Sequence, residues 1–381
     1  MESDKLTEGH DLQEAPAAEG STRASSGENE PPAEPKEGCS ALLHIPRAAT
    51  ICLLGFNWVL SLHNGVLHGE RALLFSLLGS DASSRMQATY LISNTMSPIL
   101  IWSAEANRTD LMLLESTALR LLALAAIPIS GIERVAPIYY LYSMATWNSA
   151  NLSDDRMIPS EAAKAVLPAT LLCYVLPGAL VSLVPLTATG VSLSHFNIES
   201  SSITAFFVAP LIVPCLTQMV SAVTRLAKRK AGKGGPRRKA TPGDKMTHQT
   251  QAALDVSRSL RTAYAVSFAM QATQHLYTIV SSLIRAPRGQ RSVVAVLSNL
   301  LTHQAIPRQM YSSLALYSAA TLGFGLYTVW ELRRRGLVSD KDAKKSAAGV
   351  IAGQVLFGPG ATYAGLWWWR HGVLYKTRQL A

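Results

Sequence analysis

The sequence predicts an all-α protein, a polytopic bundle of about seven to nine transmembrane helices that follows a disordered acidic N-terminal tail. Composition is the first reason, because the 381 residues are 48% hydrophobic and 16% charged, whereas soluble domains carry about 25% charged residues. The second reason is that the charges gather in a few short stretches. The third is that the remaining chain consists of apolar runs of roughly the twenty residues that a helix needs to cross a bilayer.

Residues 1–44 form the predicted tail. The first forty residues hold ten acidic side chains against three basic ones and are rich in Ala, Pro, Glu, Gly and Ser, a composition typical of disorder. The first apolar run begins near Ala48, too far along the chain for the apolar part of a signal peptide. We therefore expect no cleavable signal.

Nine apolar runs of roughly spanning length follow the tail. The third is the weakest, because it contains Glu115 and Arg120. Allowing one run to be re-entrant or interfacial leaves the expected number of crossings. The runs are Ala48–Val66, Met86–Trp102, Leu111–Ile127, Ile132–Trp147, Ala163–Leu186, Ile203–Val223, Thr262–Ile284, Met310–Trp330 and Val350–Trp369.

A basic, glycine-rich stretch divides these runs into two groups. We expect N-terminal transmembrane helices over 45–226, a basic cytosolic linker over 227–257 and C-terminal transmembrane helices over 258–375. Nine bases lie between Arg225 and Lys245, and such short basic loops stay in the cytosol; the stretch from Gly232 to Gly243 should not be helical. From this cytosolic linker the chain should cross the membrane twice before Glu331, which predicts that the basic loop after Glu331 is cytosolic too. The loop from Arg285 to Arg308 should then be lumenal, although it also holds arginines.

Several function classes find no support in the sequence. Its bases lie in short loops between apolar runs, which fits contact with anionic lipid better than nucleic-acid binding. The chain has four cysteines without CxxC spacing, and the pairs Asp154-Asp155 and Asp340/Asp342 lack the further acids that hold magnesium against a diphosphate. We expect no metal, no cofactor and no nucleic-acid partner.

Prolines recur inside the apolar runs, and two of them, Pro168 and Pro177, lie in the same run. A proline removes a backbone donor and can kink its helix. One interpretation is ordinary helix packing, since kinks are tolerated where helices face each other. The other is that Pro168 and Pro177 open an internal pocket.

Acidic side chains at membrane depth are the candidate catalytic groups: Glu133, Glu115, Asp154 and Asp155. A carboxyl in an apolar pocket stays protonated near neutral pH and can then act as a general acid. Glu133 ranks first, because Tyr140 lies about two helical turns further along the same face. The structural alternatives stay open: Glu133 can pair with Arg134, Glu115 can pair with Arg120, and the two aspartates can lie in a solvated loop.

Aromatic and polar side chains at membrane depth are the candidate substrate-binding groups. Aromatic rings stabilise a carbocation, but they also form interfacial belts, and buried polar groups often only join helices. The residues that we select are Tyr139, Tyr140, Trp147, Tyr174 and His275.

Three runs of sequence resemble a known family. They are Gly131–Tyr140, Pro168–Pro177 and Gly358–Arg370, and they are similar to stretches of fungal multi-pass membrane proteins from meroterpenoid and indole-diterpene biosynthetic clusters. Some members of that group are terpene cyclases. The resemblance implies a membrane-embedded cyclase that protonates a hydrophobic, prenylated and epoxidised substrate.

The same resemblance implies a multi-pass protein in the endoplasmic reticulum membrane that associates with other membrane enzymes of its pathway. A transporter or scaffold of that pathway is the alternative. A cyclase should enclose an aromatic-lined cavity with one acid at its end, whereas a transporter should contain a charged path that opens to each side in turn.

Overall fold

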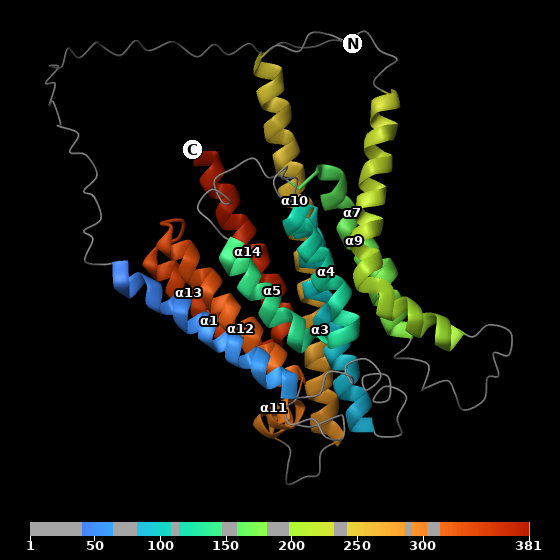
Figure 1. The fold of residues 1–381 in the computed structure, drawn as a ribbon, viewed down its shortest axis with the longest axis vertical. Helices are drawn as coiled ribbons and strands as arrows, with labels where there is room; N and C mark the ends of the chain where they lie inside the picture. The colour runs from blue at the N-terminus through green and yellow to red at the C-terminus, as the bar shows by residue number, and fades with distance from the viewer. Residues whose placement is uncertain are drawn as a thin grey trace, which may run out of the picture. The chain divides into compact units, whose positions relative to one another are not determined.

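The computed structural model describes residues 40–63, 82–107, 114–146, 158–180, 198–231, 242–285, 292–302 and 313–380. These residues are all-α, as predicted (Figure 1). They form eleven α-helices and one π-helix, which are α1 (Ser40–His63), α3 (Ala82–Ala106), α4 (Leu114–Ser130), α5 (Ile132–Thr146), α7 (Ser160–Thr170), η2 (Leu171–Val175), α9 (Ile198–Ala231), α10 (Pro242–Arg285), α11 (Val293–Thr302), α12 (Ser313–Arg334), α13 (Asp340–Leu356) and α14 (Pro359–Leu380).

Helix α3 is the centre of the packing within residues 43–381. It contacts α4, α7, α9, α10 and α14, while α12 packs against α5, α13 and α14. The largest fully buried side chains come from these helices and are Trp102, Tyr140, Tyr264, Tyr317, Tyr363 and Phe324. The core is therefore aromatic as well as aliphatic.

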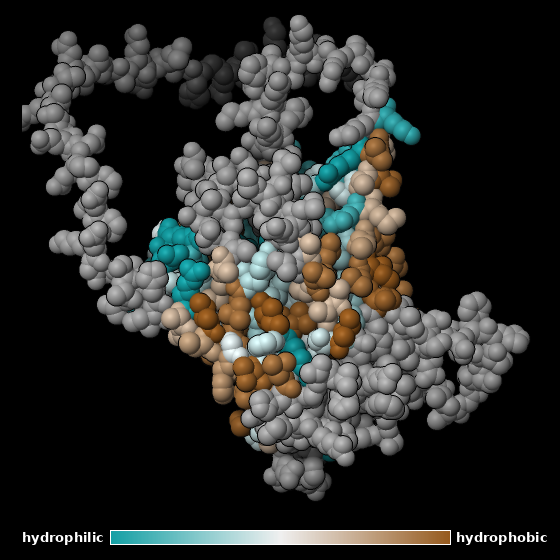
Figure 2. Space-filling view, viewed as in Figure 1, coloured by the Kyte–Doolittle hydropathy of each residue, from teal (hydrophilic) through white to brown (hydrophobic). Residues whose placement is uncertain are grey.

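Large apolar side chains also cover much of the outer surface. In Figure 2 they form brown areas across the middle of the view, while hydrophilic residues gather where α9 ends and where α12 meets α13. Two segments of the described chain, Ser160–Leu180 and Val208–Lys228, are long and apolar enough to cross a membrane by length and composition. A bundle with more crossings stays a prediction.

The last predicted run, Val350–Trp369, is wrong as a single span. Helix α13 ends at Leu356 and α14 begins at Pro359. Between them Gly358 has φ +85°, a left-handed conformation that glycine adopts readily. Proline then suits the first position of the next helix, where no backbone donor is needed.

The predicted linker 227–257 is also more helical than expected. Helix α9 continues to Ala231 and α10 begins at Pro242, so Gly243 lies in the first turn of a helix and not in a loop. The predicted loop between Arg285 and Arg308 contains the short helix α11.

Candidate functional site

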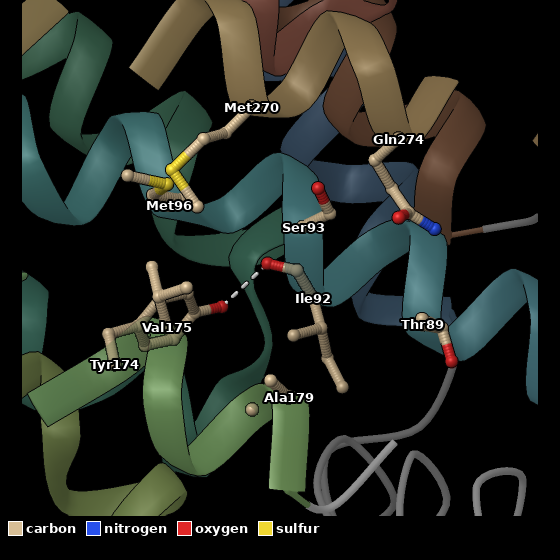
Figure 3. Close-up of a pocket in the computed structure, with 10 residues that line it drawn as sticks. Thr89, Ile92, Ser93, Met96, Tyr174, Val175, Ala179, Met270 and Gln274 are labelled. Atoms are coloured by element: carbon tan, nitrogen blue, oxygen red, sulfur yellow. Dashed lines mark hydrogen bonds between the residues drawn. The ribbon is translucent and has the colours of Figure 1, made fainter. Parts of the chain in front are cut away.

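A pocket of about 330 Å³ lies between α3, η2 with the helical residues 176–180 that follow it, and α10 (Figure 3). This volume is at the lower end of the range for small-molecule sites. Its lining residues are Thr89, Ile92, Ser93, Met96, Tyr174, Val175, Gly178, Ala179, Met270 and Gln274.

The π-helix η2 builds one wall of the pocket, and it lies between Pro168 and Pro177. The backbone N–H of Leu176 bonds to the carbonyl oxygen of Leu171, five residues back, and Pro177 has no N–H with which to return the chain to the α-helical pattern. Such π segments are frequent at functional sites. The pocket thus adjoins the segment between Pro168 and Pro177, for which an opened pocket was one of two interpretations and ordinary helix packing the other.

Tyr174 lies inside η2, and its side chain is hydrogen-bonded to α3. Its hydroxyl donates to the carbonyl oxygen of Ile92 at 2.7 Å, the bond drawn dashed in Figure 3. In that view Met96 and Met270 lie near Tyr174, and Ser93 and Gln274 lie toward the other end. The described lining is mainly apolar, with two hydroxyls and one amide that can orient a ligand.

Directly behind the pocket, Tyr90 and His275 form a buried hydrogen-bonded pair. The Tyr90 hydroxyl is 2.6 Å from His275 Nδ1, and His275 Nε2 is 3.0 Å from the carbonyl oxygen of Val355. A carbonyl only accepts hydrogen bonds, so Nε2 carries the proton and Nδ1 accepts from Tyr90 when the ring is neutral. Both residues directly follow pocket residues in the chain, namely Thr89 and Gln274.

The break between α13 and α14 is fitted against this pair. A Cβ at Gly358 would lie 2.6 Å from the Tyr90 hydroxyl oxygen and 2.9 Å from His275 Nδ1. Asn94 joins the same region, because its Oδ1 accepts from the Gly360 N–H at 2.8 Å. Glycine at 358 thus allows the break between α13 and α14 to lie close to Tyr90 of α3 and His275 of α10.

Glu133 is buried, with 3% of its surface exposed, in the first turn of α5. Its carboxyl makes a hydrogen bond with Ser313, at the start of α12, and interacts with the charge of Arg134. Arg134 also donates to the carbonyl oxygens of Ser61 and Ser130, both at 3.1 Å. Glu133 therefore lies where α1, α5 and α12 meet.

Tyr139 and Tyr140 belong to a tightly packed aromatic cluster. Tyr139 stacks on Trp102 with ring centroids 3.9 Å apart, and Tyr140 stacks on Phe324 at 4.3 Å. Trp102 Nε1 donates to the Tyr363 hydroxyl at 3.2 Å. The cluster fills the space between α3, α5, α12 and α14.

The predicted site residues therefore occupy different places. Tyr174 lines the pocket, His275 lies behind it, and Glu133, Tyr139 and Tyr140 lie on α5, which contributes no lining residue. Glu115 is in α4, but its side chain is outside the description, and Trp147, Asp154 and Asp155 lie outside the described residues. The described lining thus has one aromatic side chain and no acid, unlike the aromatic cavity expected of a cyclase.

The sequence reading did not select Tyr90, Asn94 or Ser97, although a signal was present. Their spacing places them on one face of a helix, and in the structure this face meets α10 and α14. Ser97 lies 3.0 Å from the Ser267 hydroxyl and accepts a hydrogen bond from Gln271. Small polar residues at helical spacing were thus the missed sign of a polar helix interface.

Comparison with known proteins gives one match. The model of the CtvD domain matches residues 76–311, which is more than half of the chain and includes every lining residue of the pocket. No curated protein and no solved structure matches the chain. With its pocket, Glu133 and the Tyr90–His275 pair inside the matched range, the chain belongs to the CtvD domain family.

Proposed function

We propose that this chain is a membrane-embedded terpene cyclase of the endoplasmic reticulum, which protonates a prenylated, epoxidised substrate and guides the closure of its rings. The observation that carries the proposal is Glu133, a carboxyl that is 3% exposed on the same helix as Tyr139 and Tyr140. A neutral carboxylic acid in such a position can act as a general acid.

The proposed reaction is an isomerisation. A proton passes to the epoxide oxygen, one C–O bond breaks, and the resulting carbocation is attacked by an alkene of the same molecule. The last cation loses a proton to a base, so that no atom is gained or lost overall. Aromatic rings are suited to stabilise the intermediate cations.

The pocket between α3, η2 and α10 supplies space for the substrate, but Glu133 is not part of its lining. Polar groups lie between them. Ser313, which bonds to Glu133, is one helical turn before Tyr317, and the Tyr317 hydroxyl donates to the Asn94 carbonyl oxygen at 3.3 Å. Asn94 follows the lining residue Ser93 in the chain. A backbone carbonyl accepts a hydrogen bond but passes no proton on, so we propose that the epoxide end of the substrate extends from the pocket to the Glu133 carboxyl, where the proton is transferred.

A membrane location is supported by the surface. Exposed apolar side chains occur on many helices, including Phe56, Leu122, Met219, Val223 and Ile284. Apolar surface of this extent is rare on soluble monomers and is typical of membrane or protein contact. In this membrane we also propose association with other enzymes of the same pathway.

The decisive test compares Glu133→Gln with Glu115→Gln in a heterologous host that is fed a prenylated epoxide. Glutamine keeps the shape of the side chain, but its amide cannot donate a proton to the substrate as a carboxylic acid can. We expect the unaltered chain and Glu115→Gln to form a cyclised isomer of unchanged mass, and Glu133→Gln to reduce it about a hundredfold or more. Amounts of each variant in the membrane are measured alongside.

Two results would count against the proposal. Normal cyclisation by a well-expressed Glu133→Gln removes this residue from the mechanism. If the unaltered chain forms no isomer but changes the distribution of the epoxide across vesicle membranes, the chain is a transporter and not a cyclase.

A further inference from the structure

We propose that the pocket between α3, η2 and α10 takes up an uncharged, lipid-soluble molecule with a hydroxyl or carbonyl group, which enters sideways from the bilayer. The proposal deepens the proposed function, because it assigns a place, an entrance and a charge class to the substrate. It is tested by binding, so it can hold even if no cyclisation is found.

The entrance is indicated by which lining residues are exposed. Tyr174 and Ile92 are buried, whereas Ala179 is exposed and Met270 is 37% exposed. The pocket therefore opens between the segment after η2 and α10. The outer faces of these two segments carry apolar side chains, among them Leu176 at 50% and Tyr277 at 63% exposure.

An opening surrounded by exposed apolar residues faces lipid if the chain lies in a bilayer. A molecule dissolved among the lipid tails can then reach the pocket without crossing water. The two methionines in the lining add adaptability, because their unbranched, polarisable side chains fit ligands of irregular shape.

The chemistry of the lining defines the ligand. Thr89, Ser93 and Gln274 provide two hydroxyls and one amide, and the other seven residues offer mainly apolar contact and the Tyr174 hydroxyl that already bonds to Ile92. These groups can hold one neutral oxygen function of a ligand.

The same lining argues against a diphosphate. None of the described lining residues is charged, and the described residues contain no cluster of acidic, histidine or cysteine side chains for a metal ion. A diphosphate would bring negative charge into an apolar pocket with nothing to neutralise it, which is strongly unfavourable. The pocket is thus selective for the neutral alcohol or epoxide over the prenyl diphosphate.

The test uses a farnesol analogue that carries a photoreactive diazirine, added to lipid vesicles that contain the full chain. After illumination, mass spectrometry locates the adducts. We expect adducts in the peptides that contain Met96, Tyr174 and Met270. The diphosphate of the same analogue should label these peptides about tenfold less or weaker still.

The variant Ala179→Trp places a large side chain at the entrance and should lower labelling by the alcohol about tenfold, because it takes the space of the ligand. Leu180→Trp is the matched control, since Leu180 is the next residue, is exposed and does not line the pocket. It should leave labelling unchanged. If Ala179→Trp does not reach the membrane, Thr89→Val replaces it. This variant removes a lining hydroxyl, so it should weaken labelling by the alcohol but not by an analogue of the same probe that lacks the hydroxyl group.

Three results would each overturn the proposal. They are equal labelling by the alcohol and the diphosphate, labelling by the alcohol that Ala179→Trp (or Thr89→Val in its place) leaves unchanged, and adducts confined to the outward-facing peptides of α9. None of these outcomes depends on turnover, so failure of the site and failure of the cyclase function are distinguishable.

Discussion

At the scale of single residues, the buried carboxylate of Glu331 at the end of α12 is held by two arginines. Its side chain is 1% exposed, yet it accepts hydrogen bonds from Arg334 at 2.6 and 2.9 Å and from Arg335 at 2.6 Å. Burial by itself raises the pKa of Glu331, but the two arginines outweigh it and hold the pKa below its ordinary value. The carboxylate is therefore ionised and stabilises the turn after α12.

We predict that Glu331→Gln destabilises the protein near neutral pH. Because the pKa is lower in the folded state, the stabilisation is fully present above the unfolded value of about 4.3 and is lost as the pH falls through the folded value. Unfolding in detergent should show a loss of about 1–3 kcal/mol at pH 7, and the difference from the unaltered chain should shrink on acidification.

The exposed pair in the same turn is the control for Glu331. Arg333 Nε donates to Asp340 at 2.6 Å, with both side chains in contact with solvent. Exposed pairs contribute little, because water already stabilises both charges. Asp340→Asn should leave unfolding nearly unchanged, and an equal loss in both variants would show that burial of Glu331 is not the cause.

At the scale of helices, the break between α13 and α14 rests on Gly358. We predict that Gly358→Ala destabilises the protein by about 1–3 kcal/mol, because alanine at φ +85° is strained. Its methyl group would also press on Tyr90 and His275. The measurement is the unfolding temperature in detergent, which should fall.

Gly349 is the matched control for that substitution. It lies inside α13, and a Cβ there would meet nothing within 4 Å. Gly349→Ala should stabilise the helix by about 0.5–1 kcal/mol, since alanine loses less conformational freedom on folding. Destabilisation of equal size at both positions would mean that the break does not require glycine.

The sequence predicted helices better than their breaks and partners. The apolar runs gave most helices and the prolines indicated the altered segment at η2, because both signals are local. Val350–Trp369 was read as one span, because average hydropathy does not record the conformation of Gly358. His275 was selected from the sequence but its partner Tyr90 was not, since the two are 185 residues apart and only the packing of α3 against α10 brings them together.

At the scale of the whole molecule, α12 has Glu133 near its first turn and a basic loop after its last turn. The helix has 22 residues, which is about 33 Å of length and matches the thickness of a bilayer core. Ser313, the partner of Glu133, lies at its first turn, and Glu331 with its arginines lies at its last turn. If the basic turn is cytosolic, Glu133 lies toward the lumenal side.

This orientation gives the last prediction. The basic end of α9 and the basic turn between α12 and α13 should share a compartment, because short basic loops resist translocation. A glycosylation acceptor inserted after Gly235 should remain unmodified in cells, and one inserted after Val191, in a stretch from 191 to 202 without Lys or Arg, should be modified. Modification of the first site and not of the second would reverse the orientation and move Glu133 to the cytosolic side, where its proton would have to come from the cytosol.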